Sequence, residues 1–233
     1  KIRQNLGNHY VADRSADLPS DVRVDRTIIL DDRNRHTVVA VVRETGLRRF
    51  ALMASSQGCA IAIAYAARHP EKVTHLMLYG GFVLGRLRRD PTERQREEAR
   101  TLIKLIELGW GRGTPEFRQV FTTQFMPEAT VAQHRAFDEL QRISTSPENA
   151  VRMVSEFDQI DVRDLAARVR APALVLHSRG DARVPFEEGR RMAGLIPGAR
   201  FVPLESNNHV LFATGPAWQR YIDEIVAFPR STA

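Results

Sequence analysis

The sequence predicts an α/β fold with a mostly parallel sheet, flanking helices and an inserted helical cap. From about residue 50 onward, short apolar runs alternate with helical patterns, which is typical of parallel strands joined by crossover helices. Residues 91–158 interrupt this alternation with helical patterns alone. The 233 residues, 43% of them hydrophobic, are enough for one sizeable core. We therefore expect one α/β unit with a helical insertion.

The N-terminal 49 residues are polar and irregular, and they predict little structure. We expect a helix over residues 38–44, with Asp31 or Asp32 near its start and Gly46 at its end. A short strand is expected at residues 9–13 or at residues 27–30, and the sequence leaves both open.

The elements of the sheet follow in order. An apolar strand is expected at residues 50–53, and a helix of small residues at 58–68 ends at His69-Pro70. The strand at residues 73–79 is closed by Gly80-Gly81. In the last third of the chain we expect strands at 173–177 and 200–204 and helices at 187–196 and 218–228.

The inserted segment predicts four amphipathic helices. Apolar residues recur at three- and four-residue spacing, and prolines stand near several of the expected starts, where a helix tolerates them. The expected ranges are 94–108, 115–125, 129–143 and 147–157. We expect its large apolar side chains to serve mainly for packing; they are Trp110, Phe117, Phe121, Phe125 and Met126. The chain is thus divided into a discontinuous core, residues 1–90 and 159–233, and a cap, residues 91–158.

Composition argues against several classes of partner. The net charge of +6 is carried mostly by arginines that are interleaved with acids, which indicates a solvated surface and no nucleic-acid partner. No apolar run reaches about 18 residues, so we expect no membrane partner and a soluble, cytoplasmic protein. Cys59 is the only cysteine, and we expect no metal site and no cofactor.

Residues 54–58, Ala-Ser-Ser-Gln-Gly, lie between an expected strand and an expected helix. A nucleophilic serine on such a turn needs small neighbours two positions away on either side, because its backbone is strained. Ser56 has Ala54 and Gly58 there, whereas Ser55 would have larger residues. The sequence therefore predicts Ser56 as a nucleophile, with the backbone N–H of Gln57 as an oxyanion donor at the helix start.

Two further polar residues follow expected strands. Asp181 comes after residues 173–177, and His209 comes after residues 200–204. A serine needs a histidine to take its proton and an acid to orient that histidine. The chain order Ser, Asp, His is the order that this architecture requires. Because each residue follows an expected strand, we expect all three at the sheet edge where α/β sheets bind ligands. We predict His209 within hydrogen-bond reach of Ser56 and Asp181, and assign His177 and Glu205 supporting roles.

On these motifs the chain resembles the α/β-hydrolase superfamily with a helical cap, which includes esterases, lactonases and proline-iminopeptidase-like enzymes. The resemblance runs from about residue 46 to residue 228, with the most specific phrases at residues 50–73, 172–185 and 208–209. Residues 109–111 and 144–150 are similar to a bacterial subgroup of that superfamily. A serine at the nucleophile position points away from relatives that form their intermediate on a carboxylate.

The resemblance also implies parts that residues 1–49 do not match. Family members have several strands before the nucleophile and a His-Gly loop that completes the oxyanion hole, and no His-Gly pair precedes Ser56. We expect the early strands to be missing, with either self-association along the edge beside the nucleophile strand or irregular coverage of that edge by residues 1–49. The missing donor predicts slow hydrolysis of simple activated esters.

Three functions follow as hypotheses. The first is a carboxylesterase-like serine hydrolase that acts on a small ester, lactone or amide through an acyl-enzyme. The second is a non-catalytic ligand-binding or regulatory module with an incomplete oxyanion hole. The third, a nucleic-acid-binding protein, depends on net charge alone.

Overall fold

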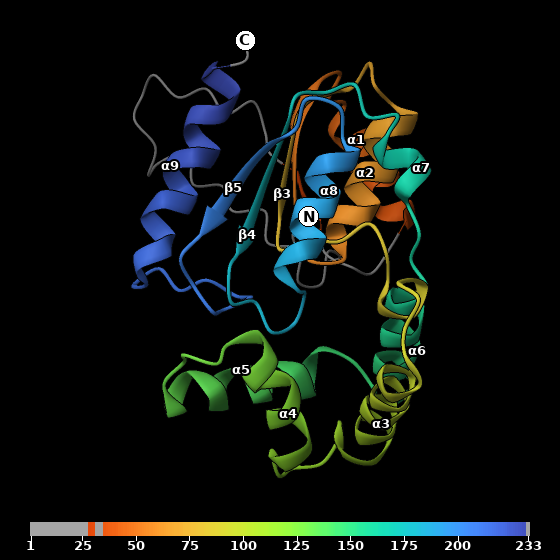
Figure 1. The fold of residues 1–233 in the computed structure, drawn as a ribbon, viewed down its shortest axis with the longest axis vertical. Coiled ribbons are helices and arrows are strands. Elements are labelled where there is room, and N and C mark those ends of the chain that lie inside the picture. The colour runs from red at the N-terminus through yellow and green to blue at the C-terminus, as the bar shows by residue number, and fades with distance from the viewer. Residues whose placement is uncertain (1–27, 31–34, 232–233) are drawn as a thin grey trace.

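The computed structural model describes residues 28–30 and 35–231. Its sheet holds five parallel strands in the order β1-β2-β3-β4-β5 (Figure 1). The strands are β1 (Ile28–Leu30), β2 (Phe50–Ser55), β3 (Val73–Tyr79), β4 (Ala173–Ser178) and β5 (Arg200–Leu204). Because every neighbouring pair is parallel, all carboxyl ends of the strands meet at one edge of the sheet.

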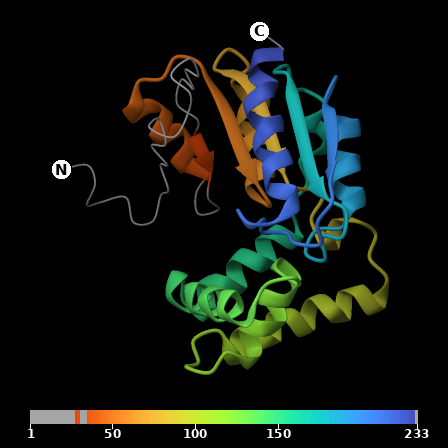
Figure 2. The same ribbon diagram turned by 90° about the vertical axis from the view of Figure 1, so that its left-hand side faces the viewer.

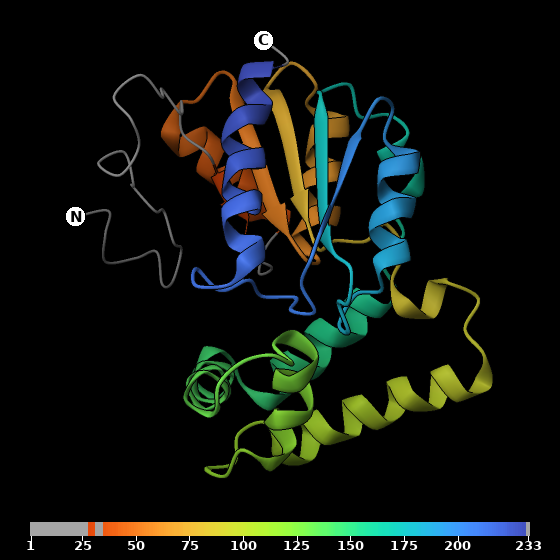
Figure 3. The same cartoon turned by 60° about the vertical axis from the view of Figure 1, so that its left-hand side comes forward.

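Helices cover both faces of the sheet, as Figures 1 and 3 show. On one face lie α1 (Arg35–Thr45), α2 (Gly58–Arg68), α7 (Arg163–Ala166) and α8 (Phe186–Leu195). The other face is covered by α9 (Pro216–Ser231). A parallel sheet covered on both faces is built from nearly continuous apolar strands, which is the pattern of β3 and β4.

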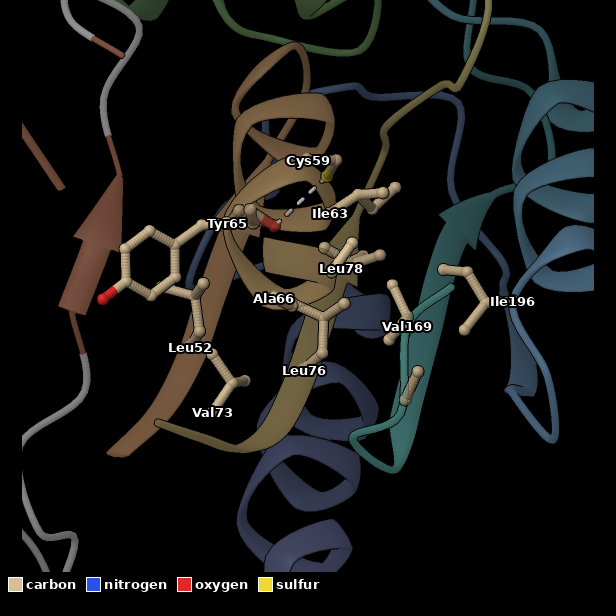
Figure 4. Close-up of a cluster of buried hydrophobic side chains, with 14 of the residues drawn as sticks. Leu52, Cys59, Ile63, Tyr65, Ala66, Val73, Leu76, Leu78, Val169 and Ile196 are labelled. Atoms are coloured by element: carbon tan, nitrogen blue, oxygen red, sulfur yellow. Dashed lines mark hydrogen bonds between the residues drawn. The ribbon is translucent and has the colours of Figure 1, made fainter. Parts of the chain in front are cut away.

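The main core lies between the sheet and α2. Leu52, Ile63 and Leu78 are fully buried there (Figure 4). The alanines of α2 let the helix lie close against the strands, because their side chains are short. This packing fixes the start of α2 at the carboxyl end of β2, which is where Ser56 lies.

Four helices between β3 and β4 form a separate layer beyond the carboxyl ends of the strands, as Figures 2 and 3 show. This helical layer consists of α3 (Glu93–Gly109), α4 (Glu116–Phe125), α5 (Val131–Ser144) and α6 (Pro147–Asp158). It has its own buried cluster around Ile106, Phe121 and Ala150. Thr92, Thr130 and Ser146 accept hydrogen bonds from the first turns of α3, α5 and α6, which explains where those helices begin.

The expected helices and strands are present with small shifts of their ends. A three-residue helix at Arg86–Arg88 and α7 were not predicted. The predicted helix at 38–44 begins earlier, at Arg35, and Gly46 follows it with a positive φ of 63°. Of the two candidate strands, β1 matches residues 27–30; residues 9–13 and the two aspartates at 31 and 32 lie outside the described residues.

The side of β2 that was expected to be an uncovered sheet edge is covered by β1. β1 pairs with β2 from Ile28 to Leu30, opposite Leu52–Ala54, so the nucleophile strand has a neighbour on both sides there. Residues before the nucleophile strand thus cover part of this edge, but with a regular parallel strand, so the expectations of irregular coverage and of missing early strands were wrong for residues 28–30. Within the described residues, no helix is both long and apolar enough to cross a membrane.

Candidate active site

Ser56 lies on the sharp turn between β2 and α2, in the conformation that the sequence predicted. Its φ is 53°, in the left-handed region that residues with a side chain rarely adopt. The turn is held by hydrogen bonds from Ser56 N–H to Tyr79 O at 2.9 Å and from Cys59 N–H to Ser56 O at 3.1 Å. Ser56 is therefore fixed at the carboxyl edge of the sheet by its own backbone.

The turn that follows β3 packs against the Ser56 turn, and position 81 there has room for glycine alone. A Cβ placed there would lie 2.3 Å from Cys59 Sγ and 3.1 Å from Ser56 O, and the first distance is far too short for a real contact. Ala54 and Cys59 are both buried in this packing. These small residues allow β3 and the Ser56 turn to approach one another.

The Ser56 hydroxyl is hydrogen-bonded to the residue that follows it. Ser56 Oγ donates to Gln57 Oε1 at 2.7 Å, and because a hydroxyl has one proton, it does not donate to His209 in this arrangement. Gln57 is also the residue that precedes α2, where backbone N–H groups have no partner within the helix. Its N–H lies at the positive end of the helix dipole of α2, directly after Ser56 in the chain.

Asp181 is buried and its carboxylate is fully engaged. Oδ1 accepts hydrogen bonds from the backbone N–H groups of Arg183 and Val184, both at 2.8 Å. Oδ2 accepts from His209 Nδ1 at 2.6 Å, so the predicted contact between Asp181 and His209 is present. Short, charge-assisted bonds of this kind fix the orientation of the imidazole.

His209 can offer its second ring nitrogen as a base. With Nδ1–H donating to Asp181, the neutral ring carries its lone pair on Nε2. The ring is buried edge-on against Phe125, with 5.3 Å between ring centroids. The backbone N–H of His209 donates to Phe125 O at 2.8 Å, so the end of α4 supports both the ring and the main chain.

The turn at Gly80 and Gly81 adjoins both halves of the site. A Cβ at Gly80 would lie 3.2 Å from His209 Cε1 and 3.7 Å from Asp181 Oδ2, and the φ of Gly80 is 58°. Gly81 faces Ser56 and Cys59. The two consecutive glycines therefore bring Ser56, Asp181 and His209 to the same part of the sheet edge.

His177 supports the acid, as the sequence suggested. Its Nε2 is 2.9 Å from Val184 O and 3.7 Å from Asp181 Oδ2. Burial lowers the pKa of His177, so its neutral form, with Nε2–H donating to Val184 O, is favoured. Glu205 lies at the surface and pairs with Arg179 at 2.7 Å, away from the buried pair.

Sequence reasoning missed the contacts that hold the His209 loop from the helical layer. Glu128 accepts hydrogen bonds from Asn207 Nδ2 at 2.6 Å and from Asn208 Nδ2 at 2.8 Å, and its own N–H donates to Asn208 Oδ1 at 3.1 Å. These pairs are about 80 residues apart, and no local pattern indicates them. The loop before His209 is therefore fastened to the segment between α4 and α5.

A cavity of about 780 Å³ opens beside Ser56 and Gln57. It lies between the core and the helical layer, because its walls include residues of α3, α4 and the turn after Asp181. The five apolar side chains assigned to packing in the cap do not line it. The large apolar side chains of its wall include Phe82, Leu102, Leu105, Val120 and Phe157. Its volume lies in the range of small-molecule sites.

Comparisons with known proteins agree with this architecture. Residues 14–216 match the family described as "alpha/beta hydrolase fold". Pyrrolizixenacetamide deacetylase from Xenorhabdus hominickii is 28% identical over 73% of this chain and 63% of that protein. Pimeloyl-[acyl-carrier protein] methyl ester esterase from Neisseria meningitidis serogroup B is 27% identical over 67% of this chain and 60% of that protein. The chain thus spans less than two thirds of the length of both relatives.

Solved structures share the fold at low sequence identity. The esterase EaEST from Exiguobacterium antarcticum matches with a TM-score of 0.73 and 21% identity, over 84% of this chain and 72% of that one. The enol-lactonase from Burkholderia xenovorans LB400 matches with a TM-score of 0.62 and 18% identity, over 84% and 69% of the two chains.

Proposed function

Because the chain belongs to the α/β-hydrolase family, we propose that it is a serine hydrolase that cleaves a small ester, lactone or amide. One observation carries the proposal: the hydrogen-bonded pair Asp181–His209 lies against the same two-glycine turn as the strained Ser56. A nucleophile, an acid and a base in that chain order, at the carboxyl edge of the sheet, are what acyl transfer on this fold needs. Three of the similar proteins bear names for acyl-transfer reactions, namely deacetylase, methyl ester esterase and enol-lactonase.

In the proposed reaction, Ser56 first turns its hydroxyl from Gln57 to His209 Nε2. Oγ then attacks the carbonyl carbon while His209 takes the hydroxyl proton, and Asp181 stabilises the imidazolium that forms. The tetrahedral oxyanion accepts a hydrogen bond from Gln57 N–H. His209 gives its proton to the leaving group, which leaves an acyl ester on Ser56. Water then attacks the acyl ester while His209 takes a proton from it, and the return of that proton to Ser56 Oγ releases the carboxylic acid.

The oxyanion site sets the expected rate. Gln57 N–H is the donor that we assign, and no His-Gly pair, the feature that supplies a second donor in the family, precedes Ser56 in the sequence. Loss of one such donor costs about 3 kcal/mol of transition-state stabilisation, a factor of about 10² to 10³ in rate. We therefore propose slow turnover of simple esters, with the helical layer acting as a cap over the cavity.

A second function has one observation in its favour. The Ser56 hydroxyl is engaged by Gln57 and not by His209, which suits a ligand-binding module that keeps the catalytic residues without using them. The two functions differ in whether Ser56 reacts.

Labelling by a fluorophosphonate probe separates them. We expect the probe to modify the protein on Ser56. Ser56→Ala should abolish labelling and should lower the rate of 4-nitrophenyl butyrate hydrolysis by about 10⁴-fold or more. Ser55→Ala, which changes the exposed neighbouring serine, is the matched control and should keep both activities. Folded protein that neither reacts with the probe nor hydrolyses the ester would refute the hydrolase and favour the ligand-binding module.

A further inference from the structure

The cavity beside Ser56 is lined by seven charged side chains. Six of them have a partner of opposite charge within 4 Å. The pairs are Arg86 with Asp158 at 2.7 Å, Arg89 with Glu188 at 3.4 Å, Arg94 with Glu98 at 3.2 Å, and Glu97 with Arg100 at 2.7 Å. The seventh is Arg183, and among the described residues it has no carboxylate at ion-pair distance.

Arg183 makes only weak contacts with its side chain. Its Nη1 donates to Gln124 Oε1 at 3.4 Å, near the upper limit for a hydrogen bond. Its guanidinium lies over the ring of Phe125, 5.3 Å from the centroid. A guanidinium has five N–H donors, so most of the binding capacity of Arg183 is unused by these two contacts.

The surroundings of Arg183 favour the binding of an anion. Burial and the neighbouring Arg86 guanidinium lower the pKa of Arg183, since both disfavour its charged form. The carboxylates of Asp158 and Asp181 act in the opposite direction, but Asp158 is paired with Arg86 and Asp181 with His209. A bound anion would offset both effects. The residue is only half-buried, however, and it lines the cavity, so a ligand in that space can reach it.

The turn that holds Asp181 also fixes Arg183. The backbone N–H of Arg183 donates to Asp181 Oδ1 at 2.8 Å, two residues along the chain from the acid that orients His209. Arg183 and Ser56 line one cavity of about 780 Å³. A ligand held by the guanidinium therefore occupies the same space as the nucleophile.

We propose that Arg183 binds a carboxylate of the substrate, so that the preferred substrate is an ester, lactone or amide whose acyl part carries a second, free carboxylate. This inference rests on the proposed hydrolase function. The planar guanidinium can hold a carboxylate through two parallel hydrogen bonds, which fixes direction as well as charge. Arg183 is then a specificity residue and takes no part in the bond-making steps.

Two esters of equal chain length test the proposal. Monomethyl adipate carries a free carboxylate where methyl hexanoate carries a methyl group, and both present the same scissile bond. We expect the ratio of kcat/KM for the charged over the neutral ester to fall by about 10- to 100-fold in Arg183→Gln, as for a lost hydrogen-bonded charge pair. Arg183→Lys keeps the charge but cannot make the two parallel hydrogen bonds of a guanidinium, and it should give an intermediate ratio.

Arg179→Gln is the matched control. Arg179 lies two residues before Asp181 as Arg183 lies two residues after it, but its side chain is exposed and pairs with Glu205. The same substitution there should leave the ratio unchanged. An unchanged ratio in Arg183→Gln, or an equal loss on both esters, would overturn the proposal, because the first denies recognition of the charge and the second indicates a structural role.

Binding distinguishes this proposal from the hydrolase function. If wild-type protein cleaves neither ester, labelling of Ser56 by the fluorophosphonate probe decides the hydrolase function, and calorimetry of monomethyl adipate with the Ser56→Ala variant decides the anion site alone. We expect binding that weakens by about 10-fold or more when Arg183→Gln is added and that weakens with salt. Equal affinity in both variants, or no binding in either, would reject the site.

Discussion

The two halves of the candidate active site are held in place by different means. Ser56 is fixed by the strand and helix next to it in the sequence and by one backbone bond to Tyr79. His209 is fixed by Asp181, by Phe125 and, through Asn207 and Asn208, by Glu128, which all lie far from it in the chain. The nucleophile is thus a local structure, whereas the base depends on the packing of the helical layer against the core.

This difference has a chemical counterpart. Both oxygens of Asp181 are used and the Nδ1 of His209 is bonded, so the acid and base need no rearrangement before reaction. The Ser56 hydroxyl, in contrast, must leave Gln57 before it can react. We therefore expect changes on the acid–base side to lower activity, and a change that frees the Ser56 hydroxyl to raise it.

The largest effect is expected from Asp181→Asn. The amide keeps the shape and the oxygen that accepts the two backbone N–H bonds, but it cannot stabilise the imidazolium and it favours the wrong tautomer of His209. We expect kcat for 4-nitrophenyl butyrate to fall by about 10³- to 10⁴-fold. Glu205→Gln, an exposed acid at the same edge, is the control and should keep its activity. A loss below about tenfold would show that Asp181 has no part in the chemistry.

A smaller loss is expected when the helical layer is released from the His209 loop. Glu128→Gln replaces a carboxylate that accepts from two asparagine amides with a group that can accept on one oxygen only. We expect kcat/KM to fall by about 3- to 10-fold, with faster hydrogen exchange at the His209 amide, because one charge-assisted bond is lost at a partly exposed site.

Glu139→Gln is the control for that variant. Glu139 lies on α5 in the same layer, and within the described residues its ion pair is with Arg142, at 2.6 Å. Its substitution should change neither activity nor exchange. If Glu128→Gln behaves like Glu139→Gln, the fastening of the loop has no bearing on the base.

The smallest effect, of opposite sign, is expected from Gln57→Ala. The backbone N–H that we assign to the oxyanion remains, while the side chain that accepts the Ser56 hydroxyl is removed. Since such a hydrogen bond is worth about 1 kcal/mol, fluorophosphonate labelling of Ser56 should become about 2- to 5-fold faster. Gln219→Ala on α9, where the amide bonds to Asp223, should leave the rate unchanged. A slower rate in Gln57→Ala would mean that the side chain positions Ser56 productively.

Much of the fold could be predicted because its signals are local. The strands β3 and β5 were predicted with their observed ends, since they are apolar runs bounded by turn residues. The helices of the inserted layer were found from the three- and four-residue spacing of their apolar residues and from the prolines near their starts. The polar, irregular sequence before residue 35 gave no comparable signal, and two alternative positions for one short strand remained open there.

The sequence by itself determined that Ser56 would occupy a strained strand-to-helix turn, because that conformation depends on neighbours within a few residues. It also determined that Asp181 and His209 would follow strands, since apolar runs mark those strands. Only the tertiary structure decided that Gln57 accepts the hydrogen bond of the Ser56 hydroxyl, that Glu128 fastens the His209 loop and that Arg183 has no carboxylate at ion-pair distance among the described residues. Such contacts depend on side-chain direction and on how distant loops close over one another, and neither leaves a periodic pattern in the chain.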